Sequence, residues 1–192
     1  MISIMKFKDC VDDWDVLGSI IAIQGITHVN ARYRELDMDT PLTYAAHAGL
    51  VSVVAALIGA GADVNVLGSN NWSALQTAAD VKSMEVVKLL LDSGAKINDV
   101  NSIGWTALHF ASMNEDVDIT KHLIGASANL NVRDADGMTA LHIASSKGYT
   151  EIVKLLLKAS ADTETRTEYD MTALDLAVGY NRKEIVKLLQ TH

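Results

Sequence analysis

Two histidines recur in one repeated phrase, and imidazole side chains can act as metal ligands or as general acids and bases. His109 lies in TALHFA and His142 lies in TALHIA, 33 residues later. A metal or catalytic site needs several converging side chains, and no carboxylate or cysteine set accompanies this pair. The sequence also contains no glycine-rich phosphate loop, nucleophile elbow or pair of catalytic acids. We therefore expect no catalytic residue, no metal ligand and no cofactor.

The single cysteine, Cys10, limits the redox chemistry of the chain. One cysteine cannot form a disulfide within the chain, and it cannot build a cysteine-based metal site. We interpret Cys10 as a small buried residue of the first helix rather than as a reactive thiol.

The elements that carry these residues follow a fixed repeat. The phrase occurs five times, with its leucine at Leu42, Leu75, Leu108, Leu141 and Leu174, so each step is 33 residues. A fixed period of this length is typical of a repeat architecture, in which one supersecondary unit buries its apolar face only against its neighbours. The sequence therefore predicts a stacked array.

Each unit contains two predicted helices. A threonine or serine precedes the first, alanine-rich helix and is suited to cap it, and Pro41 follows at a first-turn position where no donor is lost. The second helix carries leucines and valines at helical spacing, as in VVKLLL at 86–91. Gly61 and Gly94 suit the left-handed end of that helix. Ser127 and Ser160 take the same place in later units and predict more strained helix ends.

The first 39 residues contain no copy of the phrase, but residues 20–30 resemble residues 55–65 at an offset of 35. We interpret residues 1–39 as a degenerate repeat that caps the open end of the stack, with two extra residues in the loop 31–39. The helix at 51–59 has no charged outer face. We expect the N-terminal segment to cover that helix, and the alternative is a second contact patch.

Composition and charge narrow the class of partner. The chain has 192 residues, 49% of them apolar, and a formal net charge of −8. This acidic balance, without a lysine and arginine stripe, argues against a nucleic-acid partner. The N-terminal residues show no signal peptide, and the longest charge-free run, 40–62, carries the repeat phrase and predicts two packed helices rather than a membrane insertion. The expected compartment is the cytoplasm.

The repeated phrase resembles the motif of the ankyrin repeat family, which reads Gly-x-Thr-Pro-Leu-His-x-Ala-Ala, followed by a second helix that ends in leucines and by Gly-Ala-Asp-x-Asn. GMTALHIA at 137–144 departs from it at the proline, which only the first copy keeps. The resemblance implies an all-α fold, a solenoid of paired antiparallel helices with hairpin-like loops, with about five repeats and a degenerate N-terminal capping repeat. The expected boundaries in one domain, 1–192, are 1–39, 40–72, 73–105, 106–138, 139–171 and a C-terminal capping repeat at 172–192.

Proteins of this family typically bind other proteins through the hairpin tips and the inner face of the first helices. By register, the tip position before each capping residue is occupied by Asp39, Trp72, Trp105, Met138 and Met171. Ile103 and Tyr169 flank this row, and the exposed ends of the first helices are His47, Asp80, Met113, Asn114, Lys147 and Tyr180. We expect the tip position to point outward and to anchor a partner, because tryptophan and tyrosine are favoured at interfaces and methionine adapts to irregular shapes. The alternative is that these side chains fold onto the neighbouring tip and only stiffen the array.

The resemblance also implies that His109 and His142 form hydrogen bonds within the turn and brace adjacent units. His122 stands where Leu89 and Leu155 stand in other units, which predicts a buried or half-buried and locally weak position. A buried neutral imidazole there would lower stability on acidification.

The function expected from these observations is a non-enzymatic module that holds one protein partner, as an inhibitor, an adaptor or an effector. We expect a monomer, and an effector delivered into a host would act in the host cytoplasm. One alternative is a segment of a larger regulatory protein. Another is an enzyme or a small-molecule-binding protein, which would need a convergent polar pocket that the sequence does not offer.

Overall fold

The computed structural model describes residues 2–26 and 28–192. Met1 and Thr27, both within the predicted capping segment, lie outside the described residues. Within the described ranges the chain forms twelve α-helices, two short 3₁₀-helices and one isolated antiparallel bridge between Tyr33 and Asp39, without a strand. The prediction of an all-α fold is therefore confirmed for this part of the chain. Two compact units, Met1–Lys96 and Ile97–His192, are described separately below.

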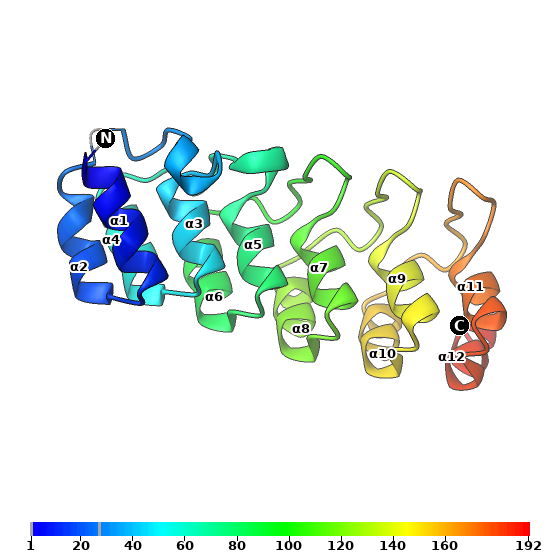
Figure 1. Cartoon of the computed structure of the whole chain (residues 1–192). Coiled ribbons are helices and arrows are strands. Elements are labelled where there is room, and N and C mark those ends of the chain that lie inside the picture. The colour runs from blue at the N-terminus through cyan, green and yellow to red at the C-terminus, as the bar shows by residue number, and fades with distance from the viewer. Residues whose placement is uncertain (1, 27) are drawn as a thin grey trace. The chain divides into compact units, whose positions relative to one another are not determined.

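The first unit contains six α-helices among its described residues, together with 3₁₀-helices η1 (Arg34–Leu36) and η2 (Ser69–Asn71). The α-helices are α1 (Ile2–Asp12), α2 (Val16–Ile23), α3 (Pro41–His47), α4 (Val51–Gly59), α5 (Ala74–Asp80) and α6 (Met84–Asp92). The helix α2 packs against both α1 and α4, while α3 packs against α5 and α4 against α6. The helices therefore stack in successive pairs (Figure 1).

The second unit repeats one motif three times, a hairpin-like loop followed by two helices (Figure 1). Its helices are α7 (Ala107–Met113), α8 (Val117–Gly125), α9 (Ala140–Lys147), α10 (Thr150–Lys158), α11 (Ala173–Gly179) and α12 (Lys183–Gln190). The first helices form one layer, in which α9 contacts α7 and α11. The second helices form another, in which α10 contacts α8 and α12.

The predicted helix caps are present. The hydroxyl groups of Thr40, Ser73 and Thr172 accept hydrogen bonds from the backbone N–H three residues later, at 3.1, 3.2 and 3.2 Å. Pro41 occupies the first turn of α3, as predicted. In each of these caps the third helical residue also accepts a hydrogen bond from the backbone N–H of the capping residue, so two donors at the helix start are satisfied.

The ends of the second helices adopt the left-handed backbone conformation. Gly61 and Gly94 have φ angles of 90° and 87°. Ser127 and Ser160, which replace glycine in later repeats, both have a φ of 64°. A side chain with a Cβ atom is disfavoured in this region, so the predicted strain at these two serines is confirmed.

We expect Ser127→Gly and Ser160→Gly each to raise the free energy of unfolding by about 0.5–1 kcal/mol, because glycine adopts a positive φ without a Cβ clash. Chemical denaturation of each variant measures this change. The matched control is Gly94→Ser, which places a serine in the same conformation and is expected to lower stability by a similar amount. A glycine variant less stable than the parent chain would contradict this interpretation.

An asparagine side chain at the start of several loops joins one repeat to the next. The side-chain oxygen of Asn65 accepts a hydrogen bond from the N–H of Lys96 at 2.8 Å. In the N-terminal segment, Asn30 accepts the equivalent bond from the N–H of Asp63 at 2.7 Å. The equal bonding shows that Asn30 and Asn65 hold equivalent places, as the offset of 35 predicted.

The outer face of α4 differs from the prediction. Ser52, Ala55 and Gly59 are exposed, so the expectation that the N-terminal segment covers them is wrong. The helix α2 packs beside α4, whose buried residues are Val53, Val54 and Leu57. Because the outer side chains are small, their exposure leaves little apolar surface in water.

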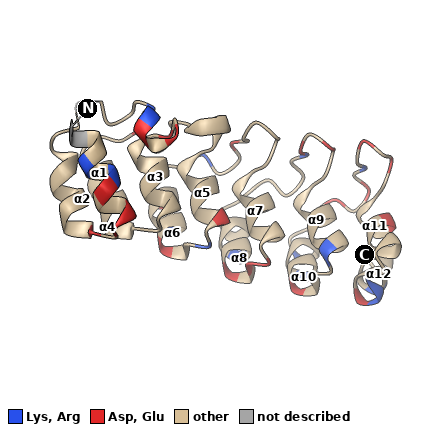
Figure 2. Ribbon diagram, viewed as in Figure 1, with Lys and Arg blue, Asp and Glu red and all other residues tan. Residues whose placement is uncertain are grey.

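Charge marks the outer surface of the last helices. Acidic and basic residues both lie on α10 and α12 (Figure 2), and Lys154 lies 3.8 Å from Glu151 and 3.5 Å from Glu184. Gln190 is exposed at the end of α12, as its polar character predicted. In the described ranges, every helix is too short or too polar to cross a membrane.

Candidate functional site

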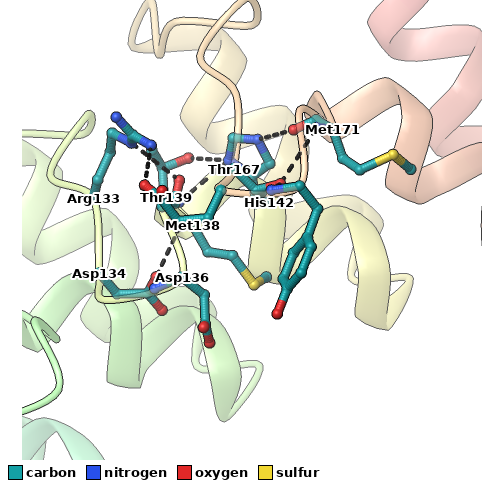
Figure 3. A network of polar contacts seen from close by, with 11 residues as sticks. Arg133, Asp134, Asp136, Met138, Thr139, His142, Thr167 and Met171 are labelled. Carbon is teal, nitrogen blue, oxygen red and sulfur yellow. Dashed lines mark hydrogen bonds and ion pairs between the residues drawn. The ribbon is translucent and has the colours of Figure 1, made fainter.

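The two repeated histidines are buried and fully bonded. The Nδ1 atom of His142 accepts a hydrogen bond from the Thr139 N–H at 3.2 Å, and its Nε2 atom lies 3.2 Å from the Met171 carbonyl (Figure 3). His109 makes the same contacts with Thr106 at 3.1 Å and with the Met138 carbonyl at 3.2 Å. Because Nδ1 accepts from a backbone N–H, the proton of the neutral ring lies on Nε2, which donates to the carbonyl. The predicted bracing role is confirmed.

Burial lowers the pKa of both imidazoles, and the hydrogen bonds to the Met138 and Met171 carbonyls oppose this shift in part. Both rings are therefore favoured in the neutral form that the observed bonding requires. Each histidine therefore connects its own repeat to the next hairpin through hydrogen bonds.

Successive hairpins of the second unit are also joined directly. The Ala135 N–H donates to the Ile103 carbonyl at 3.1 Å, and the Glu168 N–H donates to the Asp136 carbonyl at 2.9 Å. Arg133 pairs with the Glu168 carboxylate at 2.8 Å. These bonds fix the relative positions of the loops, so side chains on neighbouring tips form one surface.

Trp105 links its own hairpin to the next one. Its indole Nε1–H donates to an Asp134 carboxylate oxygen at 2.9 Å. The ring meets Phe110 edge-on with centroids 5.0 Å apart and stacks near His109 at 6.1 Å. Trp105 is consequently half-buried and held in place. The alternative, in which the tip side chain folds onto its neighbour, describes this tryptophan in part.

A groove of about 290 Å³ lies between the hairpin tips of the second unit, and we call it the Trp105 groove. Its lining residues are Ile103, Trp105, Met113, Asp134, Ala135, Asp136, Met138, Ile143, Ser146 and Lys147. Aromatic and aliphatic side chains supply most of this lining, with two aspartates and one lysine among them. A preformed apolar hollow with a few polar groups is typical of recognition sites.

A second groove, of about 280 Å³, lies in the first unit, and we call it the Trp72 groove. Its lining residues are Asp39, His47, Ser69, Asn70, Trp72, Thr77 and Asp80. Each of these seven residues stands 66 residues, or two repeats, before a lining residue of the Trp105 groove. The two grooves are therefore the same place in the repeat.

The tip residue bonds to the next hairpin in both units, but with different partners. Asp39 accepts hydrogen bonds from the N–H and hydroxyl of Ser69, at 2.8 and 3.0 Å. A Cβ atom at Gly68 would lie 2.3 Å from this carboxylate, so a larger residue there would displace the Asp39 side chain. Asp134 stands two repeats after Gly68 and supplies the acceptor for Trp105 instead.

The grooves bring together eight of the twelve predicted partner-binding residues. Asp39, His47, Trp72 and Asp80 line one groove, and Ile103, Trp105, Met113 and Met138 line the other. Tyr169 and Tyr180 are exposed outside these linings, and Met171 and Asn114 are half-buried there. All five residues of the tip row are half-buried, so each lies partly against its neighbours and is partly exposed. Their role as anchors of a partner stays a prediction.

The sequence patterns missed Asp134, Ala135, Ile143 and Ser146 as groove residues. Asp134 and Ala135 were recognisable only as turn formers, because the bond from Trp105 to Asp134 spans 29 residues. A side chain contributed by the following repeat can be found from the register, by moving one period along the chain.

A third hollow, of about 310 Å³, involves the N-terminal helices and was also missed. Val11, Asp12, Trp14, Tyr44, His47 and Ala48 line it. The Asp12 carboxylate accepts hydrogen bonds from the Tyr44 hydroxyl and from Lys8. Those bonds lower the pKa of Asp12. Trp14 is 68% exposed and has a φ of 59°, while Cys10 is half-buried nearby on α1 rather than buried.

Comparison with known families decides the assignment. The family model "Ankyrin repeats (3 copies)" matches residues 19–101, 42–134 and 108–192. The chain belongs to the ankyrin repeat family. Ankyrin repeats are a general protein–protein interaction module and are generally non-enzymatic. No curated protein matches the chain.

The ankyrin assignment fits the position of the grooves, since both lie between hairpin tips and the ends of the first helices. Over the described ranges no group of three or more His, Cys, Asp or Glu side chains is placed to hold a metal ion. The linings of the grooves offer apolar surface, hydrogen-bonding groups and charge.

Proposed function

We propose that this ankyrin repeat protein binds a partner protein through the Trp72 and Trp105 grooves, with five repeats following an N-terminal capping pair. The observation that carries the proposal is the recurrence of one groove at the same repeat position, each time with a half-buried tryptophan. Half-buried tryptophans held by packing offer large contact area at low entropic cost, which is typical of binding hot spots.

The position of the grooves favours a polypeptide over an enclosed small ligand. Each lies open between hairpin tips and holds about 280 to 290 Å³, at the lower end of the range of ordinary ligand pockets. A protein segment fills such grooves with one or two side chains and gains further contact along the rims.

We expect Ile103→Ser and Met113→Ser each to weaken partner capture by about tenfold, because each removes apolar contact area in the Trp105 groove. Capture from a lysate of the source cells, quantified by mass spectrometry, identifies the partner, and titration of the purified pair then gives the affinity. Ile103 is 49% exposed, so its replacement leaves the fold largely unaffected, which a thermal unfolding curve checks.

The matched controls are Glu85→Ala and Lys121→Ala, at exposed positions of the second helices α6 and α8. These variants are expected to capture the partner as the parent chain does. The proposal fails if the groove variants fold and bind normally while a control variant loses the partner.

A further inference from the structure

Both grooves combine an indole with two carboxylates, and the Trp105 groove adds aliphatic surface. Asp134 and Asp136 line the groove that contains Trp105, and Asp39 and Asp80 line the groove that contains Trp72. The apolar part of the Trp105 groove comes from two successive repeats of the second unit, with Ile103 and Met113 in the first and Met138 in the next. The occupant must therefore match apolar surface and acidic charge together.

The carboxylates of the Trp105 groove are not neutralised by a basic side chain of the described residues. Asp134 accepts hydrogen bonds from the Trp105 indole and from the N–H groups of Asp136 and Met138, at 2.9, 3.0 and 2.8 Å. These donors are all uncharged. Asp136 is exposed, and its carboxylate takes part in none of the ion pairs found in the described part of the chain.

Figure 3 shows the Asp136 carboxylate directed away from Arg133, whose guanidinium is engaged by Glu168. Lys147 is the one basic residue in the lining, and two carboxylates outnumber it. In the Trp72 groove the only basic side chain of the lining is the exposed His47, again against two carboxylates. A partner that covers the Trp105 groove without a cation would leave the Asp136 carboxylate buried and unpaired, which is strongly unfavourable.

We propose that the occupant of the Trp105 groove is a basic and apolar segment of a partner protein, in which an arginine or lysine stands beside an aliphatic or aromatic residue. The cation meets the carboxylates at the edge of the indole, and the apolar neighbour lies on the methionine and isoleucine side chains. Arginine is favoured over lysine, because its planar guanidinium pairs with a carboxylate through two bonds and stacks on an indole. This inference rests on the proposed function, since it names the chemistry of the partner at one of the same grooves.

The test is selection of a random dodecapeptide display library on the full chain, followed by titration of the best synthetic peptide by isothermal calorimetry. We expect the selected peptides to be enriched in arginine or lysine beside an apolar residue. We expect Asp136→Lys to weaken the best peptide by about tenfold, because it replaces an attractive charge with a repulsive one. Affinity is also expected to fall as salt rises.

The matched control is Asp118→Lys, which makes the same change of charge on the exposed surface of α8 and is expected to change affinity less than about twofold. Enrichment of acidic peptides, an equal effect of both lysine variants, or no enrichment at all would overturn the inference. The Ile103→Ser variant distinguishes a failure of the charge inference from a failure of the groove as the binding site. Peptides without basic residues that still require Ile103 would overturn the charge inference alone, whereas binding independent of Ile103 and Met113 would overturn the groove as the binding site.

Discussion

Replacement of His142 by alanine is expected to lower the free energy of unfolding by about 2–4 kcal/mol. The imidazole is 0% exposed and joins the Thr139 N–H to the Met171 carbonyl. Its removal leaves a buried donor and a carbonyl without partners, and it opens a cavity between α9 and the next hairpin. Urea denaturation followed by circular dichroism measures the loss.

The control for this substitution is His47→Ala, at an exposed position at the end of α3. Exposed substitutions without bonded partners change stability by about 0.5 kcal/mol or less. An effect of His142→Ala as small as that of the control would show that the histidine braces contribute nothing to the array.

Mild acidification is expected to destabilise the protein through His109 and His142. Their pKa values are lowered by burial, so the unfolded chain binds protons at a higher pH than the folded chain does. The stabilisation from the neutral rings is fully present above the unfolded pKa of about 6.5. It is lost progressively as the pH falls from that value toward the lowered folded pKa, because the protonated ring cannot accept from the Thr106 or Thr139 N–H.

One repeat has a residue that cannot be protonated at the position of these histidines, and it suggests a variant that removes their titration. Gln76 stands at the place of these histidines in α5, and its side-chain oxygen accepts from the Ser73 N–H at 3.0 Å. The double variant His109→Gln, His142→Gln therefore keeps the acceptor and cannot be protonated. Melting temperatures measured between about pH 7.5 and pH 5 are expected to fall less in this variant than in the parent chain. Parallel profiles for the two proteins would contradict the assignment.

A buried neutral imidazole at His122 would lower the stability of the protein on acidification, but the structure shows His122 only half-buried. The fully buried imidazoles are those of His109 and His142, which are 1% and 0% exposed. The half-burial of His122 agrees with the sequence pattern. We therefore expect the loss of stability at low pH to come from His109 and His142.

The local structure followed from the sequence because it depends on neighbours in the chain. The caps at Thr40 and Ser73 need only an acceptor three residues away, and the left-handed turns at Gly61 and Ser127 need only the end of a helix. A fixed period then implies stacking, since each unit has an apolar face to bury.

The residues that line the grooves could not all be predicted from the sequence, because each groove combines residues from neighbouring repeats. The register correctly brought Trp105 and Met138 to one surface, but the role of Asp134 as an acceptor for the indole depends on side-chain directions that the repeat pattern leaves open. For the same reason Asp39 was predicted as a contact residue, although its carboxylate is bonded to Ser69 on the next loop.

The central claim, that the protein binds its partner at the grooves between the hairpin tips, is tested most directly by the indole N–H resonance of Trp105. This proton is bonded to Asp134 at the edge of the groove, and the Trp105→Phe variant identifies its signal. Titration with the selected peptide is predicted to shift this resonance together with the amide signals of residues 134–138, while α8 and α10 stay unchanged. Saturable binding that leaves the Trp105 and Trp72 resonances in place and shifts the second helices would contradict the account.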